Sequence, residues 1–229
     1  LWVRFAGAIL LGLLYQFWYD GGDTFNYFTH GSRWIYEAFW TDPVSGVALL
    51  LEEGGQRVPE TFQFSKNIWY YRDPNSYFVV RIAAFFDLFT FHTYSSTAIL
   101  FSAFGFSGSW AMFSAVAKKY PNEASLLALG ICFIPSVLFW GSGILKDTIT
   151  LGALGWVTWS LVNIIELKNR TVWTWTVVLC ATYLIFSIKI YILICLIPAV
   201  IIWIYWDRIF SIKSMLFRVL FAPLFLLLF

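Results

Sequence analysis

The chain has 229 residues, of which 60% are hydrophobic and 12% are charged, and its formal net charge is +2 at pH 7. Soluble domains are about 45–50% apolar and about 25% charged, so this composition excludes an ordinary soluble globule. The small net charge gives no reason to expect a nucleic acid as partner. We expect an all-α, polytopic transmembrane helical bundle.

Apolar segments of membrane-spanning length recur along the chain and predict about seven spans. Their expected bounds are residues 1–18, 93–117, 124–140, 148–165, 171–188, 190–206 and 214–229. The chain starts and stops inside apolar segments, which predicts a piece of a longer protein, truncated at its C-terminus. Three parts follow from this division: a first span (1–18), an extracytoplasmic segment (19–92) and a transmembrane bundle (93–229).

Lysine and arginine in the short connections predict the orientation of the chain. They cluster after every second span, at Lys118 and Lys119, at Lys168 and Arg170, and around Arg208, Lys213 and Arg218. With these clusters in the cytoplasm, the N-terminus is cytoplasmic and residues 19–92 lie outside. The expected location is an integral one, within a membrane.

The outer segment opens with the motif Tyr19-Asp20-Gly21-Gly22-Asp23-Thr24, which places two carboxylates directly after the first span. Residues 24–41 predict a helix, and its polar stripe recurs at offsets of four and three residues, so that its members share one face. The members are Asp23, Tyr27, His30, Trp34 and Glu37. The many aromatic residues predict an interfacial helix on the outer leaflet.

The acidic and histidine side chains of this stripe are candidate ligands for a metal ion. On an α-helix Asp23 lies roughly 10 Å from His30 and roughly 21 Å from Glu37, too far for ligand bonds of about 2 Å to one ion. A divalent metal between Asp20 and Asp23, or between Asp23 and His30 across a bend, stays open. Solvated positions on an interfacial helix explain His30 and Glu37 equally well.

The rest of the outer segment predicts two further helices. Residues 44–53 predict a short helix, and residues 54–67, which open with two glycines, predict a loop. Asp73-Pro74 predicts a turn, because proline biases the residue before it away from helix. Residues 76–91 predict a helix that is either interfacial or the start of the next span.

The unusual cations fall on the outer side. Pro135 is expected to kink or end the third span, and a Gly-Ser-Gly turn that allows close backbone approach leads to Lys146 and Asp147. The helix dipole favours Asp147 in a first turn but not Lys146, which fits an anion site. Lys189 and Arg81 lie among apolar residues, where a charge needs a partner. Lys146, Lys189 and Arg81 therefore form a candidate site for a lipid phosphate, with simple headgroup anchoring as the alternative.

The layout of most of the chain resembles the C-type glycosyltransferase superfamily, polytopic membrane enzymes that use polyprenyl-phosphate-linked sugars. The resemblance rests on Asp20-Gly21-Gly22-Asp23-Thr24 after the first span, and on Pro135-Ser136 through Lys146-Asp147 after a later one. The paired acidic motif usual in the family is replaced here by two aspartates separated by Gly-Gly. This leaves open whether Asp20 or Asp23 matches the family's acidic residue.

The resemblance implies an inverting sugar transfer at the outer face of a bacterial inner membrane, with the bilayer and a polyprenyl-phosphate-linked sugar as partners. Asp23, or in second place Asp20, would be the general base for the acceptor hydroxyl. Lys146, Lys189 or Arg81 would stabilise the phosphate leaving group. The supporting residues would be His30, Glu37 and Asp147.

Two other classes of function stay open. A non-catalytic subunit of a membrane complex would use its Trp and Phe residues as lipid or partner contacts. A transporter would need charged or broken helices near the bilayer midplane, whereas the unusual charges here map to the outer rim. An outward-facing cavity that brings Asp20 or Asp23 close to Lys146 or Lys189 would favour the enzyme.

Overall fold

The computed structural model describes residues 1–211 and divides into two units, the first covering Leu1–Ile188 and the second beginning at Lys189. Every regular element within residues 1–211 is a helix, which confirms the predicted all-α class. The first unit contains residues 19–92, which keep the name outer segment after their predicted location, the helices packed around α7 and the first part of α11. These helices position all but one of the predicted site residues.

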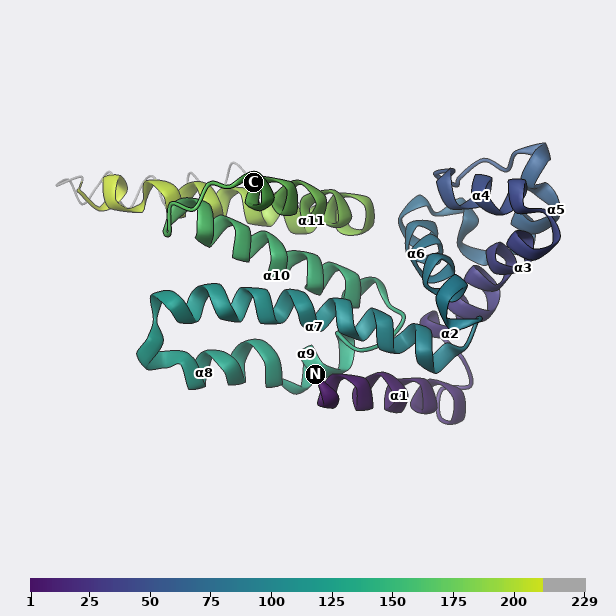
Figure 1. Cartoon of the computed structure of the whole chain (residues 1–229), viewed down its shortest axis with the longest axis horizontal. Coiled ribbons are helices and arrows are strands. Elements are labelled where there is room, and N and C mark those ends of the chain that lie inside the picture. The colour runs from purple at the N-terminus through teal and green to yellow at the C-terminus, as the bar shows by residue number, and fades with distance from the viewer. Residues whose placement is uncertain (212–229) are drawn as a thin grey trace. The chain divides into compact units, whose positions relative to one another are not determined.

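A layer of apolar helices surrounds α7 in the first unit. Its members are α1 (Trp2–Phe17), α7 (Tyr94–Lys119), α8 (Ala124–Ala128), α9 (Pro135–Trp140) and α10 (Lys146–Ile165). Helices α1, α8 and α10 all pack against α7 (Figure 1). The α7–α10 contact is close because small residues meet there: a Cβ at Gly108 would lie 1.9 Å from the carbonyl oxygen of Gly152. Such small-residue contacts are typical of helices that associate in membranes.

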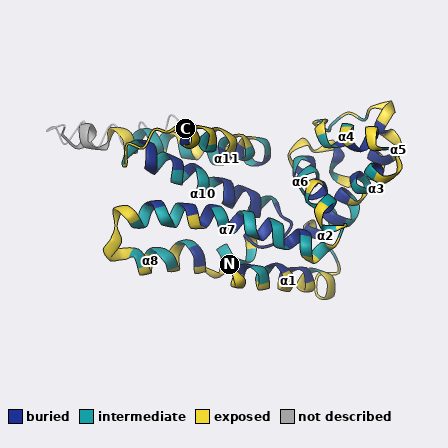
Figure 2. Cartoon of the chain, in the orientation of Figure 1, coloured by how far each residue is buried: buried dark blue, intermediate teal, exposed yellow. Residues whose placement is uncertain are grey.

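The outer segment folds into a set of short helices that pack on one another. They are α2 (Asp23–Tyr27), the π-helical turn η1 (Phe28–Ser32), α3 (Arg33–Thr41), α4 (Pro43–Leu51), the 3-10 turn η2 (Pro59–Thr61), α5 (Phe62–Ser65), the 3-10 turn η3 (Trp69–Arg72) and α6 (Pro74–Thr90). Ile35, Leu49, Ile68 and Tyr77 are fully buried between them, and Figure 2 shows buried stretches on these short helices. The prediction of a loop at residues 54–67 is wrong for residues 59–65, because these form η2 and α5.

A buried arginine fixes the turn that leads to Lys146. The guanidinium of Arg4 in α1 donates to the carbonyl oxygens of Val137 and Gly141 (both 2.9 Å) and to the Ser109 hydroxyl of α7 (3.2 Å). A Cβ at Gly141 would lie 2.0 Å from Arg4 Nη1, so glycine permits this contact. The expectation that the Gly-Ser-Gly turn allows a close approach is thereby confirmed. Arg4 ties α1, α7 and the end of α9 together immediately before α10 begins.

Three helices of the described region are long and apolar enough to cross a membrane, whereas the sequence predicts about seven spans in the whole chain. They cover Tyr94–Lys119, Lys146–Ile165 and Val172–Tyr205. Helix α1 is apolar but has only 16 residues. The membrane character of the chain is thus supported at the level of helix length and composition.

The remaining expected spans differ for local reasons. Residues 124–140 form α8, the π-helical turn η5 (Leu129–Phe133) and α9, because Ile134 is extended before Pro135 and ends the helix there. Residues 171–188 and 190–206 are joined in α11 (Val172–Ser211), which is broken at Lys189 by the non-helical φ of −147° and ψ of 76°. The seventh expected span, 214–229, lies outside the described residues.

Candidate functional site

One face of α2 and η1 packs against the turn η3. The Tyr70 hydroxyl donates to Asp23 Oδ1 (2.8 Å) and accepts from Asn26 Nδ2 (3.3 Å), while the rings of Tyr27 and Tyr70 lie 4.9 Å apart. The His30 imidazole stacks on Trp69 at 3.9 Å. Asp23, Tyr27 and His30 therefore do face the same way, as their spacing predicts.

Glu37 does not continue this contact with η3. It forms an ion pair with Arg33 one helical turn away (2.7 Å), and both side chains are solvent-exposed. This pair is the ordinary i, i+4 pairing of a helix surface. Glu37 thus matches the alternative of a solvated polar position, and its supporting role stays a prediction.

The turn after η3 binds the candidate phosphate ligand Lys146. Asp73 Oδ2 accepts from Lys146 Nζ at 3.3 Å, and the Ser76 hydroxyl donates to the same oxygen. Partial burial acts to raise the pKa of Asp73, but the Ser76 hydroxyl and the Lys146 ammonium outweigh it, so the pKa lies below its usual value. Asp73 is therefore held as a carboxylate beside the start of α10.

Asp23 and Lys146 each contact a residue of the same turn, Asp23 through Tyr70 and Lys146 through Asp73. The Asp73 amide donates to the Tyr70 carbonyl (3.1 Å), so the partner of Asp23 and the partner of Lys146 are three residues apart in a folded turn. Burial raises the pKa of the Tyr27 hydroxyl, and the nearby carboxylates of Asp23 and Asp73 raise it further. We call this group the outer polar cluster; it consists of Asp23, Asn26, Tyr27, Tyr70, Asp73 and Lys146.

The other predicted site residues lie around or apart from this cluster. Asp20 is exposed, with a φ of 55°, in the glycine turn before α2. Asp147 is half-buried in the first turn of α10. Lys189 belongs to the second unit, so its predicted role stays a prediction.

An apolar cavity of about 450 Å³ lies between the outer helices and the long helices of the first unit. Its lining consists of Leu50, Leu51, Phe78, Arg81, Ile82, Phe85, Phe86, Phe104, Ile149 and Leu184. Arg81 is the one charged residue of this lining. Its Nε donates to the Leu50 carbonyl (2.6 Å), and its guanidinium lies 5.4 Å from the ring centroid of Phe78.

The outer polar cluster lies next to one end of this cavity. Lys146 precedes the cavity residue Ile149 by three positions on α10, so both lie on the same face one turn apart. Asp73 caps α6, the helix that supplies Phe78 and Arg81 to the lining. The arrangement joins cations and a carboxylate to an apolar chamber, which suits a ligand with a polar head and an apolar chain.

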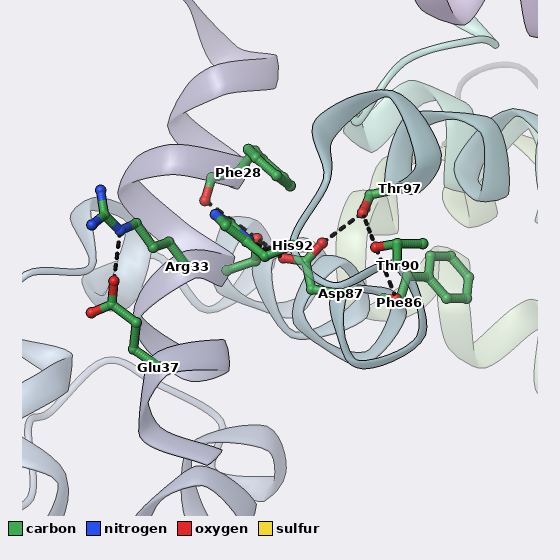
Figure 3. Close-up of polar contacts among 9 residues, drawn as sticks. Phe28, Arg33, Glu37, Phe86, Asp87, Thr90, His92 and Thr97 are labelled. Carbon is green, nitrogen blue, oxygen red and sulfur yellow. Dashed lines mark hydrogen bonds and ion pairs between the residues drawn. The ribbon is translucent and has the colours of Figure 1, made fainter. Parts of the chain in front are cut away.

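A second carboxylate, Asp87, is fully buried; in the sequence it is a lone acid among the apolar residues of 76–91. Asp87 accepts from the hydroxyls of Ser32 and Thr97 (both 2.6 Å) and contacts His92 Nδ1 at 2.9 Å (Figure 3). The His92 ring stacks on Phe28 at 4.1 Å. We call Asp87, Ser32, His92 and Thr97 the buried Asp87 cluster. Its sequence signal was the isolated Asp87 itself, since the partners come from three separate elements.

Neither a metal cluster nor a known relative identifies the site. Within residues 1–211, no group of three or more His, Cys, Asp or Glu side chains is placed to hold a metal ion. A metal bound by Asp20 and Asp23 alone stays a prediction. Comparison with protein-family models, curated proteins and solved structures finds no match for this chain.

Proposed function

We propose that this chain is an integral membrane glycosyltransferase of the C-type superfamily, which moves a sugar from a polyprenyl-phosphate carrier to an acceptor at the outer membrane face. One observation carries the proposal: the outer polar cluster adjoins an apolar cavity. Asp23 and Lys146 approach the same turn, and the face of α10 that bears Lys146 continues into the cavity wall at Ile149.

The cavity suits the apolar chain of a lipid carrier. Ligand sites are typically apolar chambers with a few polar groups that fix orientation, and here the cations Arg81 and Lys146 supply those groups. In this proposal they bind the carrier phosphate. The Lys146–Asp73 pair is partly exposed, at 24% and 51% for the two side chains. Because such pairs contribute little net energy, an incoming phosphate can displace Asp73 from Lys146.

The chemistry assigns one step to each group. An acceptor hydroxyl attacks the anomeric carbon as its proton passes to the Asp23 carboxylate, with Asp20 as the second choice of base. The bond between that carbon and the phosphate oxygen breaks, and the phosphate leaves with the electron pair. Lys146 and Arg81 stabilise the charge that develops on it. A phosphate is already a good leaving group, so no second carboxylate is required.

The membrane arrangement in this proposal is the seven-span one, in a bacterial inner membrane with a cytoplasmic N-terminus. An ion pair between Lys119 and Glu166 (2.7 Å) joins the ends of α7 and α10. It supports a common side for the basic clusters that follow these two helices, at the opposite end of α10 from Lys146. The break at Lys189 supports two spans within α11.

A transfer assay with matched aspartate variants tests this function. Membranes that contain the full chain are incubated with undecaprenyl phosphate linked to radiolabelled glucose, mannose, N-acetylglucosamine or arabinose, and release of label from the lipid phase is counted. Asp23→Asn should lower release by about 100-fold or more, as loss of a general base does. Asp20→Asn in the neighbouring turn serves as the control and should retain release.

The outcomes separate the assignment from the function itself. Loss of release in Asp20→Asn alone would transfer the base role to Asp20. Unchanged release in both variants, or no release by the wild-type chain from any of the four donors, would overturn the proposal. Membrane insertion of each variant is checked by its extraction into detergent micelles as a folded species.

A further inference from the structure

Trp69 offers an exposed aromatic face that the rest of the chain holds in place. Its side chain is 62% exposed although it lies in the folded turn η3. One ring face is covered by His30, with ring centroids 3.9 Å apart and planes within 5° of parallel. The indole is therefore fixed in orientation without being buried, and binding to it would cost little ordering entropy.

The residue that follows Trp69 is bonded to polar side chains of the helical stretch that also carries His30. Tyr70 follows Trp69 directly and bonds to Asp23 and Asn26 on the facing helix. A carboxylate accepts at several lone-pair positions, and a side-chain amide both donates and accepts. Asp23 and Asn26 therefore retain hydrogen-bonding capacity beyond their bonds to Tyr70, on the helical stretch whose His30 supports the indole.

We propose that Trp69, Asp23, Asn26 and Tyr70 form a binding site for a carbohydrate. This inference rests on the proposed function, and it identifies the acceptor of the transferred sugar as a glycan. A sugar ring has an apolar C–H face that packs on an indole and a rim of hydroxyls that bond to carboxylates and amides. The same Asp23 then lies beside the hydroxyl that it deprotonates. His30 acts as a positioning residue, because it holds the indole from the far side.

A bilayer headgroup zone is the competing partner for an exposed tryptophan. Trp40 on α3 is exposed to a similar degree (68%), and its aromatic neighbour is Tyr36, one turn away on the same helix. Trp69 differs because the residue after it is bonded to a carboxylate and an amide. An aromatic ring next to a hydrogen-bonded carboxylate and amide suits a ligand rich in hydroxyl groups, whereas a lipid acyl chain would form no hydrogen bonds with these groups.

A glycan-binding measurement tests the site with the full chain. The protein in nanodiscs of phosphatidylethanolamine and phosphatidylglycerol is applied to a printed array of bacterial oligosaccharides, and hits are quantified by titration. We expect saturable binding to at least one glycan, and a loss of affinity of about 10-fold or more in Trp69→Ala, since stacked aromatic rings contribute substantially to binding. Trp40→Ala is the matched control and should bind as the wild type does.

The outcomes distinguish this site from the proposed transferase activity. Binding that is lost in Trp69→Ala and kept in Trp40→Ala supports the site, even if no lipid-linked donor is consumed. Donor consumption without any glycan binding by the wild-type chain overturns the site and leaves the transferase standing. Equal binding by wild type and Trp69→Ala, as expected of a tryptophan that contacts only the headgroup zone, also overturns it.

Discussion

The outer polar cluster and the buried Asp87 cluster are built from the same chemistry but differ in their access to water. In each, a carboxylate accepts from a hydroxyl and also contacts a side-chain nitrogen. Asp73 contacts Lys146 Nζ, and Asp87 contacts His92 Nδ1. The Asp87 side chain is fully buried, whereas half of the Asp73 side chain is exposed. A buried charge is tolerated only when it is fully paired, so the buried cluster is suited to hold the fold. The exposed pair can exchange partners, which suits ligand binding.

The two histidines of the chain give the strongest test of this difference. His92→Ala removes the nitrogen partner of a buried carboxylate and should lower the free energy of unfolding by about 3 kcal/mol. His30→Ala removes a ring that stacks on the exposed Trp69 and should cost less than about 1 kcal/mol. Equilibrium unfolding in mixed dodecyl sulfate micelles measures both. Equal losses would show that burial does not separate the two clusters.

Single hydroxyl groups provide a smaller version of the same contrast. Thr97→Val keeps the side-chain shape but removes one donor to Asp87, and should cost about 1.5–3 kcal/mol because that bond is buried and made to a charged acceptor. Tyr70→Phe removes a donor to the exposed Asp23, where water replaces it, and should cost less than about 1 kcal/mol. The same micelle unfolding assay applies, and a larger loss in Tyr70→Phe would contradict the comparison.

Much of the fold and part of the candidate site could be predicted from the local sequence. Helical periodicity placed Asp23, Tyr27 and His30 on one face, and Pro135 did end a helix. The motifs around Asp23 and Lys146 marked two groups that each contact η3 or the residue after it. These features depend on residues within one or two turns of each other, where spacing and backbone restriction decide the outcome.

The sequence did not predict the partners that these site residues find far away along the chain. Tyr70 is 47 residues from Asp23, and Asp73 is 73 residues from Lys146, so no spacing rule connects them. The cavity depends on five elements packing together, and the short helices at residues 59–65 replace a predicted loop. Asp87 showed as a charge in an apolar run, but its partners become visible only once η1, α6 and α7 are assembled.

The ion pair of the outer cluster should be weakly coupled. A double-mutant cycle with Asp73→Asn and Lys146→Met should give a coupling free energy below about 1 kcal/mol, because water screens a partly exposed pair. The same Lys146→Met substitution should still impair consumption of the lipid-linked donor. Coupling well above that value would mean that Asp73 is not readily displaced by a phosphate, and the binding proposal would lose its exchange step.

The smallest expected effect is a pH dependence with opposite signs at two carboxylates. The lowered pKa of Asp73 means that its stabilisation is present above about pH 4, the usual unfolded value, and is lost as the pH falls through the folded value. Burial raises the pKa of Glu52, so the stabilisation linked to that group is present below about pH 4 and is lost as the pH rises. Unfolding midpoints of Asp73→Asn and Glu52→Gln between pH 3 and 7 should therefore deviate from wild type in opposite directions. Parallel curves for both variants would show that neither carboxylate senses the surroundings described here.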